Sequence, residues 1–233
     1  SANTFSLLVN DLNDAPVLAS GVANFTDIEE DDTNTSGDLV SDLLNGQLSD
    51  VDTTYSEGVA IYSVAAGNGT WQYASGGAPN TWVGFPSGID TTNALLLAST
   101  YSIRFVPSND NADSASITYY GWDQSSSAST DLVDASTVGG QTPYSVASGT
   151  STIAVSDIND QPVLDTSTTP ITLTPINEGD TGSIVYSASV LISSQSGLTI
   201  TDSDPADSKG IAITDASESN GQWEYSSDGV NNW

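Results

Sequence analysis

The alternation of hydrophobic and polar residues along this chain is that of β-strands. Residues 152–158 (TIAVSDI) alternate, and residues 116–122 (SITYYGW) carry the β-branched and aromatic side chains that strands favour. Residues 59–74 predict a hairpin, because an Asn-Gly pair at its centre can supply the positive φ of a tight turn. Within it, Trp71 and Tyr73 stand two positions apart and therefore share one face.

Helical patterns are short and weak. Residues 38–44 (DLVSDLL) and 94–99 (ALLLAS) are the two candidates, and no segment sustains a 3.6-residue period. Many short strands separated by Gly, Asn and Ser turns predict an all-β fold, an antiparallel immunoglobulin-like β-sandwich. The predicted core consists of Val59, Ile61, Trp71, Leu95, Leu97, Ile103, Phe105, Ile117, Tyr119, Ile153 and Val155.

The chain repeats itself. Residues 10–18 (NDLNDAPVL) return as residues 156–164 (SDINDQPVL), 146 positions later. Three further pairs follow in the same order: 28–33 with 176–181, 48–52 with 200–204, and 57–73 with 209–225. Four matches in one order indicate an internal duplication.

The duplication predicts a domain organisation. Residues 1–14 would be the last strand of a preceding repeat with its linker, residues 15–160 a complete repeat, and residues 161–233 the first half of a following repeat. The chain therefore looks like a piece of a longer protein. The sequence leaves open whether residues 161–233 are ordered alone or completed by another chain.

The net charge and composition of the chain argue against several classes of function. The chain has 30 acidic side chains and only two basic ones, Arg104 and Lys209, for a formal net charge of −28. Nucleic acids and anionic membrane surfaces attract basic proteins, so neither partner is expected. The chain has no Cys and no His, which argues against zinc chemistry and Ser-His catalysis. No apolar run approaches the roughly 20 residues needed to cross a bilayer, so membrane insertion is not expected.

The acidic residues gather at the repeat junctions. Two carboxylates 4 Å apart repel by about 4 kcal/mol at an effective dielectric near 20, so a cluster of them needs water or a cation. Asp-x-Asn-Asp at 11–14 and 157–160, with Asp-x-Asp at 50–52 and 202–204, offers the oxygen ligands that calcium prefers. One such motif alone is typical of a solvated turn. Its repetition with a second motif at a similar interval favours Ca²⁺ as the cofactor.

These motifs resemble a known family. The linker Asp-x-Asn-Asp-x-Pro, the Asp-x-Asp and an early Glu are similar to those of the cadherin domain. The phrases NGTWQYASGGAPNTW, ALLLASTYSIRFVPSND and ASITYYGWDQ resemble more closely the cadherin-like tandem repeats of giant, RTX-type bacterial surface adhesins. The resemblance covers nearly the whole chain.

The resemblance implies two calcium sites between neighbouring repeats. The first would use Asp11, Asn13, Asp14, Asp50, Asp52 and Asp123. The second would use Glu30, Asp110, Asp157, Asn159, Asp160, Asp202 and Asp204. Glu30 has rivals in Glu29, Asp31 and Asp32, and Asp110 has one in Asp113.

The implied function is mechanical. A calcium-stiffened stalk repeat of a secreted adhesin would project a terminal binding module from a bacterial cell surface into an extracellular, calcium-rich medium. Its partners would be neighbouring repeats of the same polypeptide, with other copies of the chain as a further option.

Three alternatives belong to other classes. An S-layer or filament subunit could be built from the same repeat. A glycan-binding module could use an aromatic platform, although aromatic residues spaced at i, i+2 more often pack in a core; its candidates are Trp71, Tyr73, Trp82, Trp122, Trp223 and Trp233. An enzyme is not expected, because the paired acids lie at repeat junctions and imply no single cleft. Arg104 is expected to pair with a local carboxylate.

Overall fold

A computed structural model describes most of the chain as two compact units, residues 1–158 and 159–233. The described residues are 4, 6–8, 11–76, 81–108, 112–165, 167, 173–180, 184–191, 199–204, 206–217 and 221–227. The predicted boundary after residue 160 lies two positions from the division between the units.

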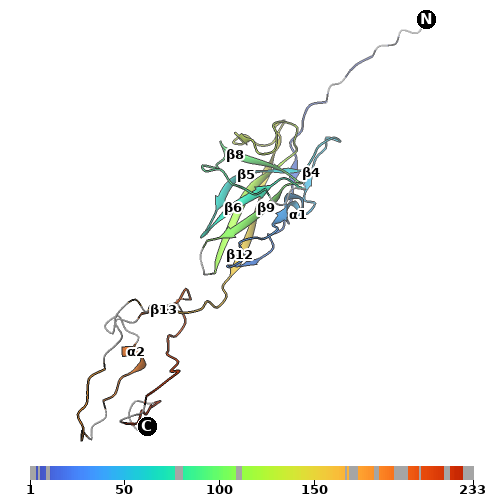
Figure 1. Ribbon diagram of the computed structural model, residues 1–233. Helices are drawn as coiled ribbons and strands as arrows, with labels where there is room; N and C mark the ends of the chain where they lie inside the picture. Colours follow the sequence, from blue (N-terminus) through green and yellow to red (C-terminus); the bar gives the residue numbers. More distant parts are fainter. Residues whose placement is uncertain are drawn as a thin grey trace. The chain divides into compact units, whose positions relative to one another are not determined.

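Unit 1 is a β-sandwich of two main sheets, as predicted (Figure 1). The larger sheet has the order β11-β8-β5-β10-β12-β2. Its strands are β2 (Ile28–Glu29), β5 (Gly58–Ala65), β8 (Ala94–Ala98), β10 (Asp113–Trp122), β11 (Leu132–Val133) and β12 (Tyr144–Ser156). The smaller sheet has the order β3-β9-β6-β7, with β3 (Asp38–Leu39), β6 (Gly69–Ala74), β7 (Val83–Gly84) and β9 (Ser102–Pro107). Pairing is antiparallel except between β12 and β2.

Two small elements complete the sandwich. The strands β1 (Val17–Leu18) and β4 (Leu48–Ser49) pair with each other, and the helix α1 (Val40–Leu44) lies between β3 and β4 in sequence. The helix confirms the helical candidate at residues 38–44 only for residues 40–44, because residues 38–39 form β3. Asn45 is the C-cap of the helix, and its left-handed backbone (φ 50°) stops the helix from continuing.

All eleven predicted core residues are buried, none more than 4% exposed. They lie in one cluster between the two sheets, which α1 and the β1–β4 pair also join. The ring of Trp71 packs 4.8 Å from Phe25 and 5.1 Å from Phe105, measured between centroids, so the loop after β1 packs against two neighbouring strands of the smaller sheet.

The predicted hairpin is wrong. β5 pairs with β8 and β10, whereas β6 pairs with β7 and β9, so the segment crosses from one sheet to the other as a β-arch. The positive φ lies at Gly67 (49°), where a Cβ would come within 2.3 Å of the Asp113 carboxylate. That carboxylate accepts the N–H of Asn68. Val59 and Ile61 of β5 and Trp71 of β6 pack in the same core from opposite sheets. The chain must therefore cross from one sheet to the other between these two strands.

The helical candidate at 94–99 is also wrong, since its first five residues form β8. This strand is apolar throughout because both of its faces are buried. Leu95 and Leu97 face the main core, while Ala94 and Leu96 face a second cluster on the outer side of the larger sheet.

Residues 123–143, between β10 and β12, cover that outer face; we call them the excursion. The second cluster contains Trp122 and Tyr144, which flank the excursion in sequence, together with Ala135 from within it. The fold therefore has a partial third layer that the strand pattern did not indicate.

Among the described residues, Arg104 is held by neutral groups, and the predicted pairing with a carboxylate is not found there. Its side chain is 9% exposed and donates to Gln72 Oε1 (2.9 Å), Asn34 Oδ1 (3.2 Å) and the Thr35 carbonyl (3.2 Å). The guanidinium lies 4.3 Å from the ring centroid of Trp82. Arginine thus ties the loop before β3 to the smaller sheet, a task that suits its planar set of donors.

Unit 2 repeats part of the local structure of unit 1, although residues 209–217, the equivalent of β5, form no strand. Its strands β13 (Val163–Asp165) and β14 (Thr199–Thr201) pair in the register of β1 and β4, with Leu164 opposite Ile200 as Leu18 is opposite Leu48. A short helix, α2 (Ala188–Leu191), lies between them in sequence.

The match extends to single hydrogen bonds. The indole N–H of Trp223 donates to the Ser217 carbonyl at 2.9 Å, as that of Trp71 donates to Ala65 at 3.2 Å. Core positions of unit 1 are nevertheless exposed in unit 2. Trp223 is 60% exposed, against 2% for Trp71.

Candidate metal centre

The first linker, residues 11–14, is bound to the end of the sandwich of unit 1. The Asp14 N–H donates to Asp52 Oδ2 (2.9 Å), and the Ala15 N–H donates to the Gly140 carbonyl (2.8 Å). Proline at position 16 then leads into β1. These bonds bring the Asp-x-Asn-Asp and Asp-x-Asp motifs together although they are 36 residues apart (14 and 50).

Asn13 fixes the linker to two further segments. Its Nδ2 donates to Asp123 Oδ2 (3.0 Å), to the Asp14 carbonyl (2.9 Å) and to the Thr142 carbonyl (3.3 Å). These bonds orient the side-chain amide of Asn13, whose oxygen is of the ligand type that calcium accepts.

The Asp-x-Asp pair of unit 1 lies outside the strands. The two residues do not share a strand face; they lie in the bend after β4, where the Asp52 N–H donates to Asp50 Oδ1 at 2.9 Å. Asp50 Oδ2 is buried and has no hydrogen-bond donor among the described residues. A buried carboxylate oxygen without a donor is costly unless a cation compensates it.

Asp123 is the most buried acid of this site, at 3% exposure. It directly follows β10. Its Oδ1 accepts the Ser125 N–H (2.7 Å), and its Oδ2 accepts Asn13 Nδ2. Burial raises the pKa of the neighbouring Tyr144 hydroxyl, and the charges of Asp123 and Asp134 raise it further.

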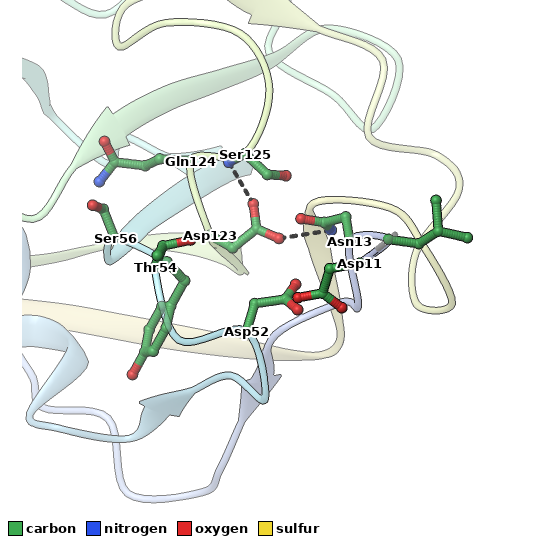
Figure 2. Close-up of a pocket in the computed structure, with 10 residues that line it drawn as sticks. Asp11, Asn13, Asp52, Thr54, Ser56, Asp123, Gln124 and Ser125 are labelled. Atoms are coloured by element: carbon green, nitrogen blue, oxygen red, sulfur yellow. Dashed lines mark hydrogen bonds between the residues drawn. The ribbon is translucent and has the colours of Figure 1, made fainter. Parts of the chain in front are cut away.

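Four of the predicted ligands line one pocket of about 260 Å³ at the end of unit 1, whereas Asp14 and Asp50 are not among its lining residues. Figure 2 shows Asp11, Asn13, Asp52 and Asp123 facing it from the linker, from the bend after β4 and from the end of β10. The sequence predicted these four. It missed the lining residues Thr54, Ser56, Gln124 and Ser125, which lie in loops and carry no distinguishing motif.

The donor set fits a hard cation. All the candidate ligands offer oxygen, the pocket is lined by three carboxylates, and no Lys or Arg is among its lining residues. Calcium takes six to eight such ligands from carboxylates, carbonyls and water. Asp14 takes part through its backbone N–H, which donates to Asp52 Oδ2. Asp50 accepts the N–H of Asp52.

Unit 2 has the same linker arrangement within itself. The Asp160 N–H donates to Asp204 Oδ2 (2.7 Å), the Asp204 N–H to Asp202 Oδ1 (3.2 Å), and Asn159 Nδ2 to the Asp160 carbonyl (2.8 Å). Asp204 is 6% exposed, and its Oδ1 is buried without a donor among the described residues. The linker geometry is thus a property of the motif and recurs at both copies.

Within unit 1, Glu30 and Asp157 form a second acidic pair. Each offers a carboxylate oxygen, and the two oxygens lie within 4.8 Å of each other. Glu30 is 3% exposed, and its Oε1 accepts the Ile158 N–H at 3.0 Å. Asp157 Oδ1 accepts the Ala112 N–H at 3.2 Å. Buried or paired acids of this kind could hold a metal ion.

The rivals to the predicted acids have other surroundings. Glu29, Asp31 and Asp32 are exposed, and Asp32 Oδ2 accepts the Glu29 N–H in a local turn. Asp113 holds the β-arch. Asp110 lies outside the described residues.

The tryptophans of unit 1 that were candidates for a glycan-binding surface do not form one on the described surface. Trp71 and Trp122 are core residues at 2% and 1% exposure, and Trp82 covers Arg104. Trp233 lies outside the described residues.

Comparison with protein-family models, with curated proteins and with solved structures found no match. Neither helix that the structure describes is long and apolar enough to cross a membrane.

Proposed function

We propose that this chain is part of a calcium-stiffened stalk of a secreted bacterial adhesin, in which each repeat junction holds Ca²⁺. The observation that carries the proposal is the docked linker of unit 1. It gathers carboxylates from three distant segments around one pocket, with no basic side chain among the lining residues. The resemblance to cadherin-like adhesin repeats supports the same function.

The stiffening follows from electrostatics. Without a cation, Asp11, Asp52 and Asp123 repel one another across the pocket, and the linker is held only by a few hydrogen bonds. A bound Ca²⁺ would neutralise part of this charge and join the linker to the body of the repeat. Extracellular calcium modules bind with Kd values of about 10⁻⁴ to 10⁻³ M, which suits a calcium-rich exterior.

The proposal extends to the second junction through the repeated motif. Asn159, Asp160, Asp202 and Asp204 reproduce the bonds of Asn13, Asp14, Asp50 and Asp52. That Glu30, Asp110 and Asp157 join them rests on the sequence resemblance. An S-layer or filament subunit would use the same joints, and ordered lateral association of the chain in calcium would distinguish it from a stalk.

Asp52→Asn is expected to weaken calcium binding by at least about tenfold. The amide still accepts the Asp14 N–H but removes one of three charges from the pocket. Titration calorimetry would measure the affinity. The matched control is Asp42→Asn, which removes the same charge from the exposed side of α1.

Equal calcium affinity in Asp52→Asn and Asp42→Asn would contradict this location of the site. A wild-type chain that binds no calcium at millimolar concentration would contradict the proposed function itself.

A further inference from the structure

We propose that Trp122 is a positioning residue of the cation site, because it seats the excursion that carries Asp123 and receives the linker. This inference rests on the proposed function. Trp122 belongs to the second hydrophobic cluster and does not line the pocket, but it would determine where the Asp123 carboxylate lies.

Trp122 is fixed on both sides of its ring. It is 1% exposed and packs in the cluster on the outer face of the larger sheet. Gly58 on β5 makes room for it, since a Cβ there would lie 2.7 Å from the indole ring. The indole N–H donates to the Ser126 carbonyl at 3.2 Å, so the ring holds the first turn of the excursion as well as the sheet.

The first part of the excursion, residues 124–130, has a strained backbone. Gln124, Ser127 and Thr130 have φ values of 61°, 64° and 75°, in the left-handed region that non-glycine residues rarely adopt. Such residues persist only where their surroundings enforce the conformation. Here the Trp122 indole, the Gln124 amide on the Glu57 carbonyl and the Thr130 N–H on the Leu96 carbonyl do so.

The strained turn sets the direction of the Asp123 carboxylate. The Ser125 N–H donates to Asp123 Oδ1 at 2.7 Å, which leaves Oδ2 facing Asn13 of the linker. Because Ser125 lies between Trp122 and its acceptor Ser126, movement of the indole would move this N–H and the carboxylate with it.

The far end of the excursion receives the linker. The Gly140 carbonyl accepts the Ala15 N–H, and the Thr142 carbonyl accepts Asn13 Nδ2. Tyr144, 5% exposed, returns the chain to the same cluster as Trp122. The excursion is therefore anchored at both ends in one core and carries two contacts to the linker between them.

Trp122→Phe tests this assignment, with Trp71→Phe as the matched control. Each variant replaces a buried indole by a smaller ring and removes one indole-to-carbonyl bond, but Trp71 lies in the main core. We expect Trp122→Phe to weaken calcium binding by about tenfold in titration calorimetry, the range found when groups that orient metal ligands are lost. Trp71→Phe should bind as the wild type does, at a similar loss of melting temperature.

Equal affinities of the two variants would overturn the proposal, whether both match the wild type or both fall with stability. If Trp122→Phe does not fold, Gln124→Asn decides the question. Asn tolerates a positive φ but is one methylene too short to reach the Glu57 carbonyl, and we expect it to weaken binding severalfold. Wild-type affinity in Gln124→Asn would then overturn the proposal, while a wild-type chain that binds no calcium would remove the proposed function first.

Discussion

Millimolar calcium is expected to raise the melting temperature of unit 1 by about 3–10 °C relative to chelator. A ligand at 10 to 100 times its Kd stabilises the native state by about 1.4–2.7 kcal/mol. These ratios correspond to about 10 mM Ca²⁺ and the Kd range of extracellular modules. For a unit of this size, each kcal/mol shifts the melting temperature by about 2–4 °C.

Scanning calorimetry of the chain in calcium and in chelator would measure the shift. Magnesium at the same concentration is the control for ionic strength, because Mg²⁺ is smaller, demands strict octahedral geometry and gives up its waters reluctantly. Identical melting temperatures in calcium and chelator would contradict the account. An equal shift in magnesium would point to general screening of the −28 charge.

Trp71→Ala is expected to destabilise unit 1 by about 3–5 kcal/mol, the cost of emptying a large core position. The ring is 2% exposed, packs against Phe25 of the first loop and Phe105 of the neighbouring strand β9, and its N–H donates to the Ala65 carbonyl at the start of the β-arch. Urea unfolding followed by tyrosine and tryptophan fluorescence would measure the loss.

Trp82→Ala is the comparison, since this half-buried ring covers Arg104 without entering the core cluster. We expect it to cost about 1 kcal/mol, the range of a single cation–π contact. A Trp71→Ala loss no larger than that of Trp82→Ala would show that the core is wrongly assigned. Glycan binding that Trp82→Ala abolishes would support the lectin alternative instead.

The sequence predicted those features that depend on local pattern or on repetition. Alternation identified the buried face of β12, because side-chain direction has a fixed period along a strand, and β-branched and aromatic residues identified β10. The resemblance to cadherin-like repeats implied that the linker motifs at 11–14 and 157–160 would meet Asp-x-Asp residues, and Asp14 bonds to Asp52 as Asp160 bonds to Asp204.

The wrong predictions concern which strands and side chains contact one another. Such contacts depend on residues that are far apart in the sequence. An Asn-Gly turn between two apolar runs predicts a hairpin, yet β5 and β6 belong to different sheets because Trp71 is needed on the far side of the core. Residues 94–99 suggested a helix because a strand buried on both faces loses its alternation. Arg104 found neutral acceptors although acids are abundant, since its burial selects whatever oxygen the enclosing loops supply.

The excursion could not be predicted, and with it the supports of Asp123. Its residues are mostly Ser, Thr, Ala and Gly, a composition typical of a solvated loop. It is ordered by a second cluster on the outer sheet face, which consists of Trp122, Tyr144, Ala60 of β5, Ala94 and Leu96 of β8, and Ala135 of the excursion itself. Sequence distance hides this cluster, because its members are spread over residues 60 to 144.

Hydrogen exchange at the linker amides tests the central claim, that a cation at the linker stiffens the joint. The relevant N–H groups are those of Asp14, Ala15 and Asp160, each already bonded within its own unit. In millimolar calcium the account predicts much slower exchange at all three than in chelator, with the effect at Asp14 and Ala15 lost in Asp52→Asn. Exchange rates at these amides that are the same with and without calcium would contradict it.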